Sequence, residues 1–325
     1  MDDRFMNELR RDPDSKFTRS LREKLREQEP SPVMRALRPA PALAFASVGL
    51  VVVALFVFPE VRVSAQAMLD LFRVRKFEAV EIDESHMDRL KKLGGDNTLM
   101  VFDEHVKLVD PGPPQVFASL AEAVSATGLV ARQPTFFANG VTADTVLVVG
   151  ASSGQLSVSE AKLRALLDAL ALADVAVPAG IDGKRIDLRK EPTIIQKFVK
   201  GQWRASLVQS KSPELSVPAG FDMARMAEIG LRVLGLDAGE ARRVARNTDW
   251  RSTLVVPVPV NASTFRQVTV HGQQALLITT SGEPAKDGQR HRNGTVVLWS
   301  EGDQVFGMMG NMSSQEVMLM AESVQ

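Results

Sequence analysis

Cysteine is missing from this chain of 325 residues, and only 4 histidines occur. Without cysteine the protein has no disulfide bond, no thiolate metal ligand and no cysteine nucleophile. An exported domain of this sequence must therefore be stabilised by its hydrophobic core alone. The stretch that follows residue 59 is long enough to bury such a core without covalent cross-links.

An excess of charge of either sign is also missing. Lys plus Arg and Asp plus Glu number 39 each, so the protein as a whole does not attract the phosphates of a nucleic acid. We therefore expect no nucleic-acid partner. Hydrophobic residues make up 45% and charged residues 24%, which is typical of folded globular domains. Most of the chain is expected to fold.

One stretch contains no charged residue at all. It runs from Pro39 to Pro59, and Ser47 is the only polar side chain between Pro41 and Phe58. About 20 helical residues, each rising about 1.5 Å, span the roughly 30 Å hydrocarbon core of a bilayer. We therefore predict one transmembrane helix over residues 39–59. Its apolar residues include Leu43, Val48, Val52 and Leu55.

The alternatives to this anchor are a buried helix of a soluble protein and a cleaved signal peptide. A buried helix of a soluble protein usually keeps a polar stripe, which this stretch lacks. A cleaved signal peptide would use Ala65-Gln66-Ala67 as its cleavage site, but the charged segment before the apolar run is too long for such a peptide. Long C-terminal domains cross the membrane largely regardless of charge, whereas a basic N-terminal tail stays inside. We expect a single-pass protein of the cell membrane, with a cytoplasmic N-terminus and an extracytoplasmic C-terminal domain.

The segment before the anchor contains one helix pattern. Asp12-Pro13 is typical of an N-cap followed by proline at the first helical position, and Phe17, Leu21 and Leu25 then recur every four residues. The spacing predicts a short amphipathic helix. Three apolar side chains cannot build a core, so this helix lies on the inner membrane surface, binds a cytoplasmic partner, or stays solvated.

The same segment resembles a known family. Asp12-Pro13, Phe17 and the run Leu21-Arg22-Glu23-Lys24-Leu25 look like the N-terminal segment of single-pass bacterial anti-sigma-type regulators. The resemblance implies that Phe17, Leu21 and Leu25 bind a sigma factor or another cytoplasmic regulator. Many members of that family bind zinc in this segment through one histidine and two cysteines, and this segment has neither residue type.

After the anchor, strand patterns alternate with helix patterns. Val63 to Arg75 predicts a helix that stands on the membrane and leads to a strand at Phe77 to Ile82. The other expected strands are Leu99 to Leu108, Val146 to Val149, Arg185 to Leu188, Ile194 to Val199, Trp203 to Val208, Leu254 to Val260, Phe265 to Val270, Ala275 to Thr280, Val296 to Ser300 and Gln304 to Met309. Neighbouring strands joined by short turns imply antiparallel hairpins.

Helix starts interrupt these strands. Three of them fit the S-x-x-E capping box, namely Ser119 with Glu122, Ser157 with Glu160 and Ser313 with Glu316. Two further helices are expected in tandem, at Asp222 to Leu234 and at Asp237 to Arg246. This mixture predicts α+β architecture, with helices packed on an antiparallel sheet.

The chain is accordingly predicted to have four segments. Residues 1–38 form the cytoplasmic segment, and residues 39–59 form the transmembrane helix. Residues 60–114 supply a membrane-proximal helix and strands, and residues 115–325 form the extracytoplasmic α+β domain.

A second resemblance covers much of this domain. Ser119-Leu120-Ala121-Glu122-Ala123, followed by Gly128-Leu129 and Pro134, looks like a stretch of uncharacterised bacterial ectodomains of single-pass anti-sigma-type or sporulation-type membrane proteins. The C-terminal runs Val297-Leu298-Trp299, Glu301-Gly302, Gly310-Asn311-Met312-Ser313 and Ala321-Glu322-Ser323 are similar to the closing strand, turn and helix of that family. Some of its members have the curved half-barrel of lipoprotein carriers. The resemblance implies a domain that senses or binds a ligand and does no chemistry.

One motif suggests catalysis. Residues 150–154 satisfy the G-x-S-x-G pattern around Ser152, and His271 and His291 follow as candidate bases. A nucleophile elbow requires a helix that begins at the serine, whereas the expected cap is Ser157, so we interpret residues 150–154 as a loop of small residues. The histidines show no metal-ligand spacing such as H-E-x-x-H. We predict no catalytic residue, no metal site and no cofactor.

The sequence therefore favours a non-enzymatic, membrane-anchored regulator or sensor with an extracytoplasmic ligand-sensing domain, similar to an anti-sigma factor. The alternative is a membrane-tethered carrier or chaperone for apolar ligands or lipoproteins. A hydrolase centred on Ser152 is the third class. The expected partners are the lipid bilayer, a cytoplasmic sigma factor or other regulator, and an apolar ligand or envelope protein.

Overall fold

The computed structural model describes residues 70–82, 108–259, 263–280 and 294–325. All described residues belong to one compact unit. Within the described ranges, no helix is long and apolar enough to cross a membrane. The expected cytoplasmic helix and the expected transmembrane helix over residues 39–59 lie outside these ranges.

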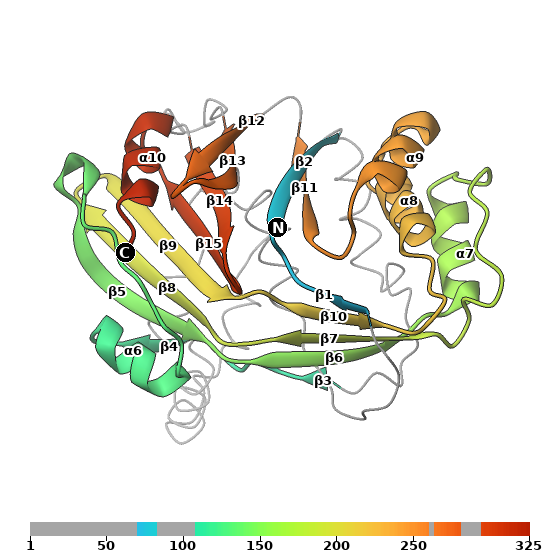
Figure 1. Cartoon of the computed structure of the whole chain (residues 1–325), viewed down its shortest axis with the longest axis horizontal. Coiled ribbons are helices and arrows are strands. Elements are labelled where there is room, and N and C mark those ends of the chain that lie inside the picture. The colour runs from blue at the N-terminus through green and yellow to red at the C-terminus, as the bar shows by residue number, and fades with distance from the viewer. Residues whose placement is uncertain (1–69, 83–107, 260–262, 281–293) are drawn as a thin grey trace, which may run out of the picture. The chain divides into compact units, whose positions relative to one another are not determined.

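The described part is an α+β domain with mainly antiparallel sheets, as the sequence predicts (Figure 1). An eight-stranded sheet consists, in spatial order, of β12 (Ser263–Val270), β13 (Gln273–Thr280), β14 (Gly294–Glu301), β15 (Gln304–Gly310), β9 (Trp203–Lys211), β8 (Thr193–Lys200), β5 (Thr142–Val149) and β4 (Gln115–Phe117). A five-stranded sheet consists of β1 (Asp70–Phe72), β10 (Glu214–Val217), β7 (Arg185–Lys190), β6 (Ser152–Ser157) and β3 (Leu108–Val109). All pairings in these two sheets are antiparallel.

The two sheets meet at a bend that crosses three neighbouring strands. Strand β5 leads into β6, β7 into β8 and β9 into β10, with two residues between the strands of each pair. The pairing continues through the bend without a shift, because Val149 pairs with Thr193 and Ser152 pairs with Lys190. Pro192 and Pro213 lie in the bend, where they donate no ladder hydrogen bond. Successive side chains alternate between the faces of a strand, so each face of one sheet continues into the other.

Two helices cover one face of the eight-stranded sheet. Helix α10 (Ser314–Glu322) buries Val317 and Met320 against a core that contains Trp299 and Phe306. The rings of Trp299 and Phe306 are stacked, with centroids 5.1 Å apart. Helix α6 (Leu120–Thr127) packs on the same sheet through Ala123.

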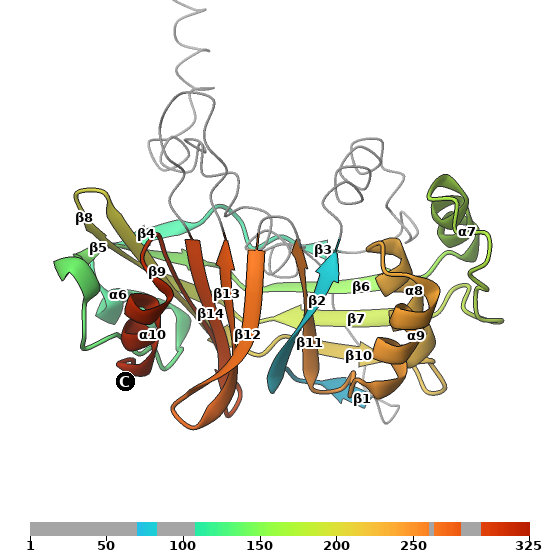
Figure 2. The same cartoon turned by 90° about the horizontal axis from the view of Figure 1, so that it is seen from above.

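A parallel two-stranded ribbon, β2 (Lys76–Ile82) with β11 (Thr253–Pro259), covers part of the other face. Phe77 and Val256 of the ribbon pack against Leu276 and Leu298 of the sheet. The ribbon also contacts helices α8 (Met223–Val233) and α9 (Ala238–Asn247), through residues that include Ile82. Figure 2 shows the ribbon between strand β12 and these two helices. Helix α7 (Glu160–Ala169) packs against α8.

The sequence-based expectations for secondary structure are largely confirmed. The described strands at 76–82, 142–149, 185–190, 193–200, 203–211, 253–259, 263–270, 273–280, 294–301 and 304–310 match the expected ones. Ser119 and Ser313 cap helices as expected, and Ser313 and Glu316 form a complete capping box. The two helices expected in tandem are present, and Asp222 and Asp237 cap them. The expected strand at Leu99 to Leu108 lies outside the described residues, except for Leu108 in β3.

Three local expectations were wrong. Residues 70–72, expected at the end of a helix, form strand β1 because their backbone pairs with β10. Ser152 to Ser157, expected as a loop that leads to a helix cap, form strand β6 because they pair with β7. Helix α7 is consequently capped by Ser159, whose hydroxyl accepts a hydrogen bond from the backbone N–H of Lys162.

Gly150 lies where the bend approaches the loop before β4. A Cβ atom at this position would lie 2.5 Å from the carbonyl oxygen of Pro111. Gly150→Ala should therefore lower the free energy of unfolding by about 1–3 kcal/mol, measured by urea unfolding. Ala151→Ser changes the exposed neighbour and should have no measurable effect. Equal unfolding midpoints for the two variants would contradict this close contact.

Candidate functional site

The predicted partner-binding residues are not part of the described structure. Phe17, Leu21 and Leu25 lie outside the described residues, and so do the transmembrane positions Leu43, Val48, Val52 and Leu55. Their roles stay predictions. A candidate site within the described domain must therefore be sought on the sheets and helices.

The five-stranded sheet has an apolar face. Leu188 pairs with Gly154 on one side and with Leu215 on the other, and Ile186 pairs with Leu156. Cross-strand partners point to the same face, so Leu156, Ile186, Leu188 and Leu215 form one apolar surface. All four are only half-buried. Within the described part of the chain, none of the four belongs to a buried hydrophobic cluster.

The opposite face of this sheet is polar. Ser153, Arg189 and Glu214 are neighbours across the strands, and Arg73 reaches Glu214 at 3.4 Å. Arg189 forms a second ion pair with Glu191, at 3.3 Å. Antiparallel sheets commonly solvate a polar face and cover an apolar one. The apolar face, which no described cluster covers, is therefore the candidate binding surface of the domain.

A buried polar pair lies at the end of this apolar face, next to the bend. Ser152 pairs directly with Lys190, and each is only 3% exposed. Both point to the same side of the sheet as Leu188, because Lys190 is two residues from Leu188 on β7 and Ser152 is the cross-strand partner of Lys190. Burial lowers the pKa of Lys190 to about 8, since the charged amine loses hydration.

Further buried polar groups hold the bend together. The hydroxyl of Ser210 donates a hydrogen bond to the carbonyl of Pro192, at 3.0 Å. The backbone N–H of Val74 donates to the hydroxyl of Ser212 at 2.6 Å, which ties the start of the ribbon to the bend. The hydroxyl of Thr193 has no hydrogen-bond partner within the described residues.

The arrangement does not match the hydrolase pattern considered from the sequence. Ser152 begins a strand and not a helix, so it does not sit on a nucleophile elbow. His271 has both ring nitrogens engaged, by Glu301 and by the carbonyl of Glu322. His291 lies outside the described residues. The group that the structure places beside Ser152 is Lys190, which the sequence pattern did not indicate.

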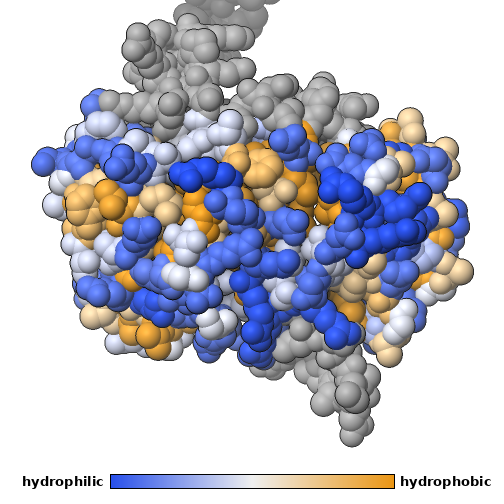
Figure 3. All heavy atoms as spheres, turned by 45° about the horizontal axis from the view of Figure 1, so that its top comes forward, coloured by the Kyte–Doolittle hydropathy of each residue, from blue (hydrophilic) through white to orange (hydrophobic). Residues whose placement is uncertain are grey.

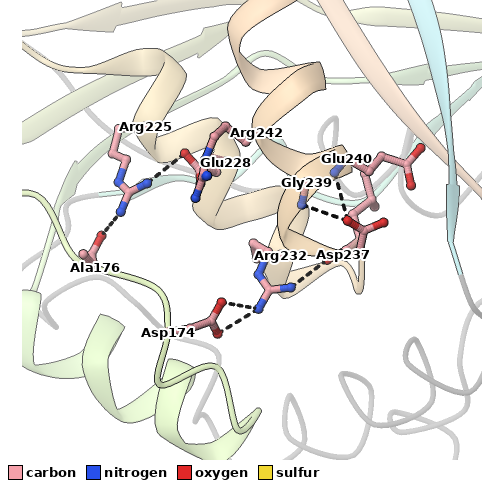
Figure 4. A network of polar contacts seen from close by, with 10 residues as sticks. Asp174, Ala176, Arg225, Glu228, Arg232, Asp237, Gly239, Glu240 and Arg242 are labelled. Atoms are coloured by element: carbon pink, nitrogen blue, oxygen red, sulfur yellow. Dashed lines mark hydrogen bonds and ion pairs between the residues drawn. The ribbon is translucent and has the colours of Figure 1, made fainter.

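A network of ion pairs joins α8 to α9 and to the segment that follows α7 (Figure 4). Arg232 donates to both carboxylate oxygens of Asp174, each at 2.8 Å. Glu228 accepts from Arg225 at 2.8 Å and from Arg242 at 3.3 Å. Figure 3 shows a strongly hydrophilic surface over this region. Because the charges are paired within the network, we interpret it as structural.

A second polar cluster joins Arg132, His271 and Glu301. The Nδ1 atom of His271 lies 2.7 Å from Glu301 Oε1, and the indole N–H of Trp299 donates to the same oxygen at 3.0 Å. Arg132 forms an ion pair with Oε2 and stacks over Phe306, 5.3 Å from the ring centroid. Burial disfavours charge on Glu301, but the hydrogen bonds from Arg132, His271 and Trp299 outweigh burial and hold its pKa below the usual value.

Metal binding by the described residues would need several suitable side chains close together. No group of three or more His, Asp or Glu side chains among them is arranged to hold a metal ion. The candidate site thus consists of apolar surface next to one buried amine, a combination that suits an apolar molecule.

Comparisons with known proteins do not identify the chain. No protein-family model, no curated protein and no solved structure matches it. The function is therefore inferred from the residues of this chain.

The depressed pKa of Lys190 makes stability depend on pH. Its folded-state pKa of about 8 lies below the usual 10.5. Between pH 8 and pH 10.5 the amine is therefore mostly protonated in the unfolded chain and mostly neutral in the folded one. Because the unfolded state binds more protons, the wild type gains stability as pH rises. The free energy of unfolding of Lys190→Met minus that of the wild type should fall by about 3 kcal/mol between pH 7 and 10.5. It is measured by urea unfolding, followed by tryptophan fluorescence. Lys211→Met, at an exposed position of β9, serves as the control. A constant difference between Lys190→Met and the wild type would show that burial does not perturb the amine.

Proposed function

We propose that this protein is a non-enzymatic regulator or sensor, anchored in the membrane by one helix over residues 39–59, whose extracytoplasmic domain binds an apolar ligand. The uncharged run of residues 39–59 supports the anchor. The resemblance of the N-terminal segment to anti-sigma-type regulators supports a cytoplasmic partner.

The observation that carries the ligand-binding part is the apolar face of the five-stranded sheet. Leu156, Ile186, Leu188 and Leu215 are half-buried and lie outside the buried clusters of the described residues. Fully burying a leucine-sized side chain contributes about 1.5–3 kcal/mol, and only a minority of each of these side chains is exposed, so covering the exposed part contributes up to about 1 kcal/mol per side chain. An apolar ligand that lies along this face would gain that free energy.

The signal would pass through the anchor. Ligand binding can shift an equilibrium only if the ligand binds one state of the protein better than the other. We propose that the ligand-bound state changes the availability of Phe17, Leu21 and Leu25 to a sigma factor or another transcription regulator. Association of chains through the single anchor is one route for this change.

The same apolar face favours a second candidate, a membrane-tethered carrier or chaperone for apolar ligands or lipoproteins. In that case the ligand is passed to another envelope component, and the cytoplasmic segment has no part in the activity. The two candidates share ligand binding and differ in the need for residues 2–30.

Ligand binding is tested by a pair of neighbouring substitutions on β7. Leu188→Gln places a polar group on the apolar face, whereas Arg189→Gln changes the polar face. The full-length protein in lipid nanodiscs is titrated with a fluorescent acyl-chain probe. Leu188→Gln should weaken binding up to about fivefold, because it removes up to about 1 kcal/mol of apolar burial, and Arg189→Gln should bind like the wild type. Equal binding by all three proteins, or no binding by the wild type, would reject the ligand site.

The signalling part is tested by deleting residues 2–30. The full-length protein and the deletion variant are each purified from native membranes, and the bound proteins are identified by mass spectrometry. The full-length protein should recover a sigma factor or another transcription regulator that the deletion variant does not recover. If both recover the same envelope proteins, and the transcript profile of the cell is unchanged by the deletion, the carrier is correct and the regulator is not.

A further inference from the structure

His271 occupies an unusual backbone position. It forms, with Gly272, the two-residue turn between β12 and β13, and both residues have positive φ, 48° and 74°. Turns of this kind favour Asn-Gly, because a side chain at positive φ is strained and asparagine tolerates it best. The backbone of His271 is therefore strained, and contacts of its side chain must offset the free energy of this strain.

The side chain of His271 makes two hydrogen bonds to acceptors. Its Nδ1 lies 2.7 Å from the carboxylate of Glu301, and its Nε2 lies 2.8 Å from the backbone carbonyl of Glu322. Neither partner can donate, since one is an ionised carboxylate and the other a carbonyl. A neutral imidazole has only one N–H, so both hydrogen bonds form together only when the ring is protonated.

Three parts of the chain face the ring, and two of them present a charged side chain. Glu301 at the end of β14 and Arg132 on the segment before η1 (Ala138–Gly140) face it, and the last turn of α10 presents the carbonyl of Glu322. The negative end of a helix dipole favours a cation at this place. Arg132 opposes a second cation, but it is bound to the other oxygen of Glu301. Burial disfavours protonation of His271, yet its hydrogen bonds with Glu301 and Glu322 outweigh burial and raise its pKa.

The last turn of α10 is also joined to the segment that carries Arg132. Gln133 and Gln325 exchange two backbone hydrogen bonds, each 3.1 Å, and the N–H of Thr135 donates to the carbonyl of Ser323 at 3.0 Å. The helix that covers Trp299 and Phe306 is thus held at its C-terminal end by backbone pairing and by the ring of His271.

We propose that His271 is a pH-operated latch, which fastens the C-terminal end of α10 to β14 when the ring is protonated and releases it when the ring loses its proton. The direction follows from the raised folded-state pKa: the stabilisation is complete below the unfolded-state pKa of about 6.5 and is lost as pH rises through the folded-state pKa. The latch requires neither a ligand on the apolar face nor the cytoplasmic segment, so it stands apart from the proposed function.

Hydrogen exchange of the full-length protein measures the latch directly. After correction for intrinsic rates, the amides of residues 319–325, which are the last turn of α10 and the residues after it, should lose about tenfold in protection between pH 6 and pH 8.5, which corresponds to one charge-assisted hydrogen bond. His271→Asn keeps a residue suited to the turn but carries no titratable proton, and its protection should not change with pH beyond the intrinsic rate. His291→Asn, a histidine outside the described residues, should behave like the wild type. Identical pH profiles for the wild type and His271→Asn would overturn the latch.

A second measurement stands even if His271→Asn folds poorly. The wild-type protein with isotope-labelled histidine is titrated by NMR, and the resonance of His271 is assigned by its absence in His271→Gln. Its midpoint should lie above 6.5, and Glu301→Gln, which keeps an acceptor and removes the charge, should lower it. A midpoint at or below 6.5 in the wild type, or no shift in Glu301→Gln, would overturn the proposal.

Discussion

The arrangement of this domain depends on a bend that three neighbouring strands pass without losing register. Gly150 lies against the carbonyl of Pro111, where a side chain has no room, and Pro192 and Pro213 lie in the bend without donating to the ladder. A shift by one residue would exchange the faces of the sheet beyond the bend. Because the pairing is unshifted, the side that α6 and α10 cover on the eight-stranded sheet continues as the apolar face around Leu188.

The bend also explains how the start of the described chain is built into the domain. Strand β1 pairs with β10, and its backbone at residue 72 is in register with Leu215. The next residues are fixed to the bend through Ser212 and to the eight-stranded sheet, where the hydroxyl of Ser300 donates to the carbonyl of Arg75 at 2.5 Å. A ligand on the apolar face would therefore touch a strand that pairs directly with β1. Strand β1 is also the first described element after the proposed anchor.

Sequence patterns identified the long strands and most helix caps because those features are local. Strand β6 was missed because its residues 152–157 contain a single large apolar side chain, Leu156. Residues 70–72 were assigned to a helix because Ala67, Leu71 and Val74 have helical spacing, although pairing with β10 decides their conformation. The parallel pairing of β2 with β11 joins segments far apart in the chain, and no short-range pattern indicates it. Lys190 beside Ser152 and the cluster around Glu301 are likewise products of tertiary pairing.

The latch and the apolar face lie at different places on one continuous sheet. From Glu301 the hydrogen-bonded path runs from β14 to β15 and then to β9, which continues through the bend into β10. Such a path does not by itself couple two sites, because coupling requires an element with two discrete states that both sites bias.

Helix α10 is the element that His271 holds. The residues on which α10 packs include Trp299 and Phe306, whose rings are stacked and fully buried. Release of one histidine hydrogen bond, about 1.5–3 kcal/mol, is enough to loosen that last turn and too little to unpack such a core, which costs about 3–5 kcal/mol for a single large aromatic. The structure thus favours a latch that acts locally on the end of α10 and leaves the ligand face unchanged.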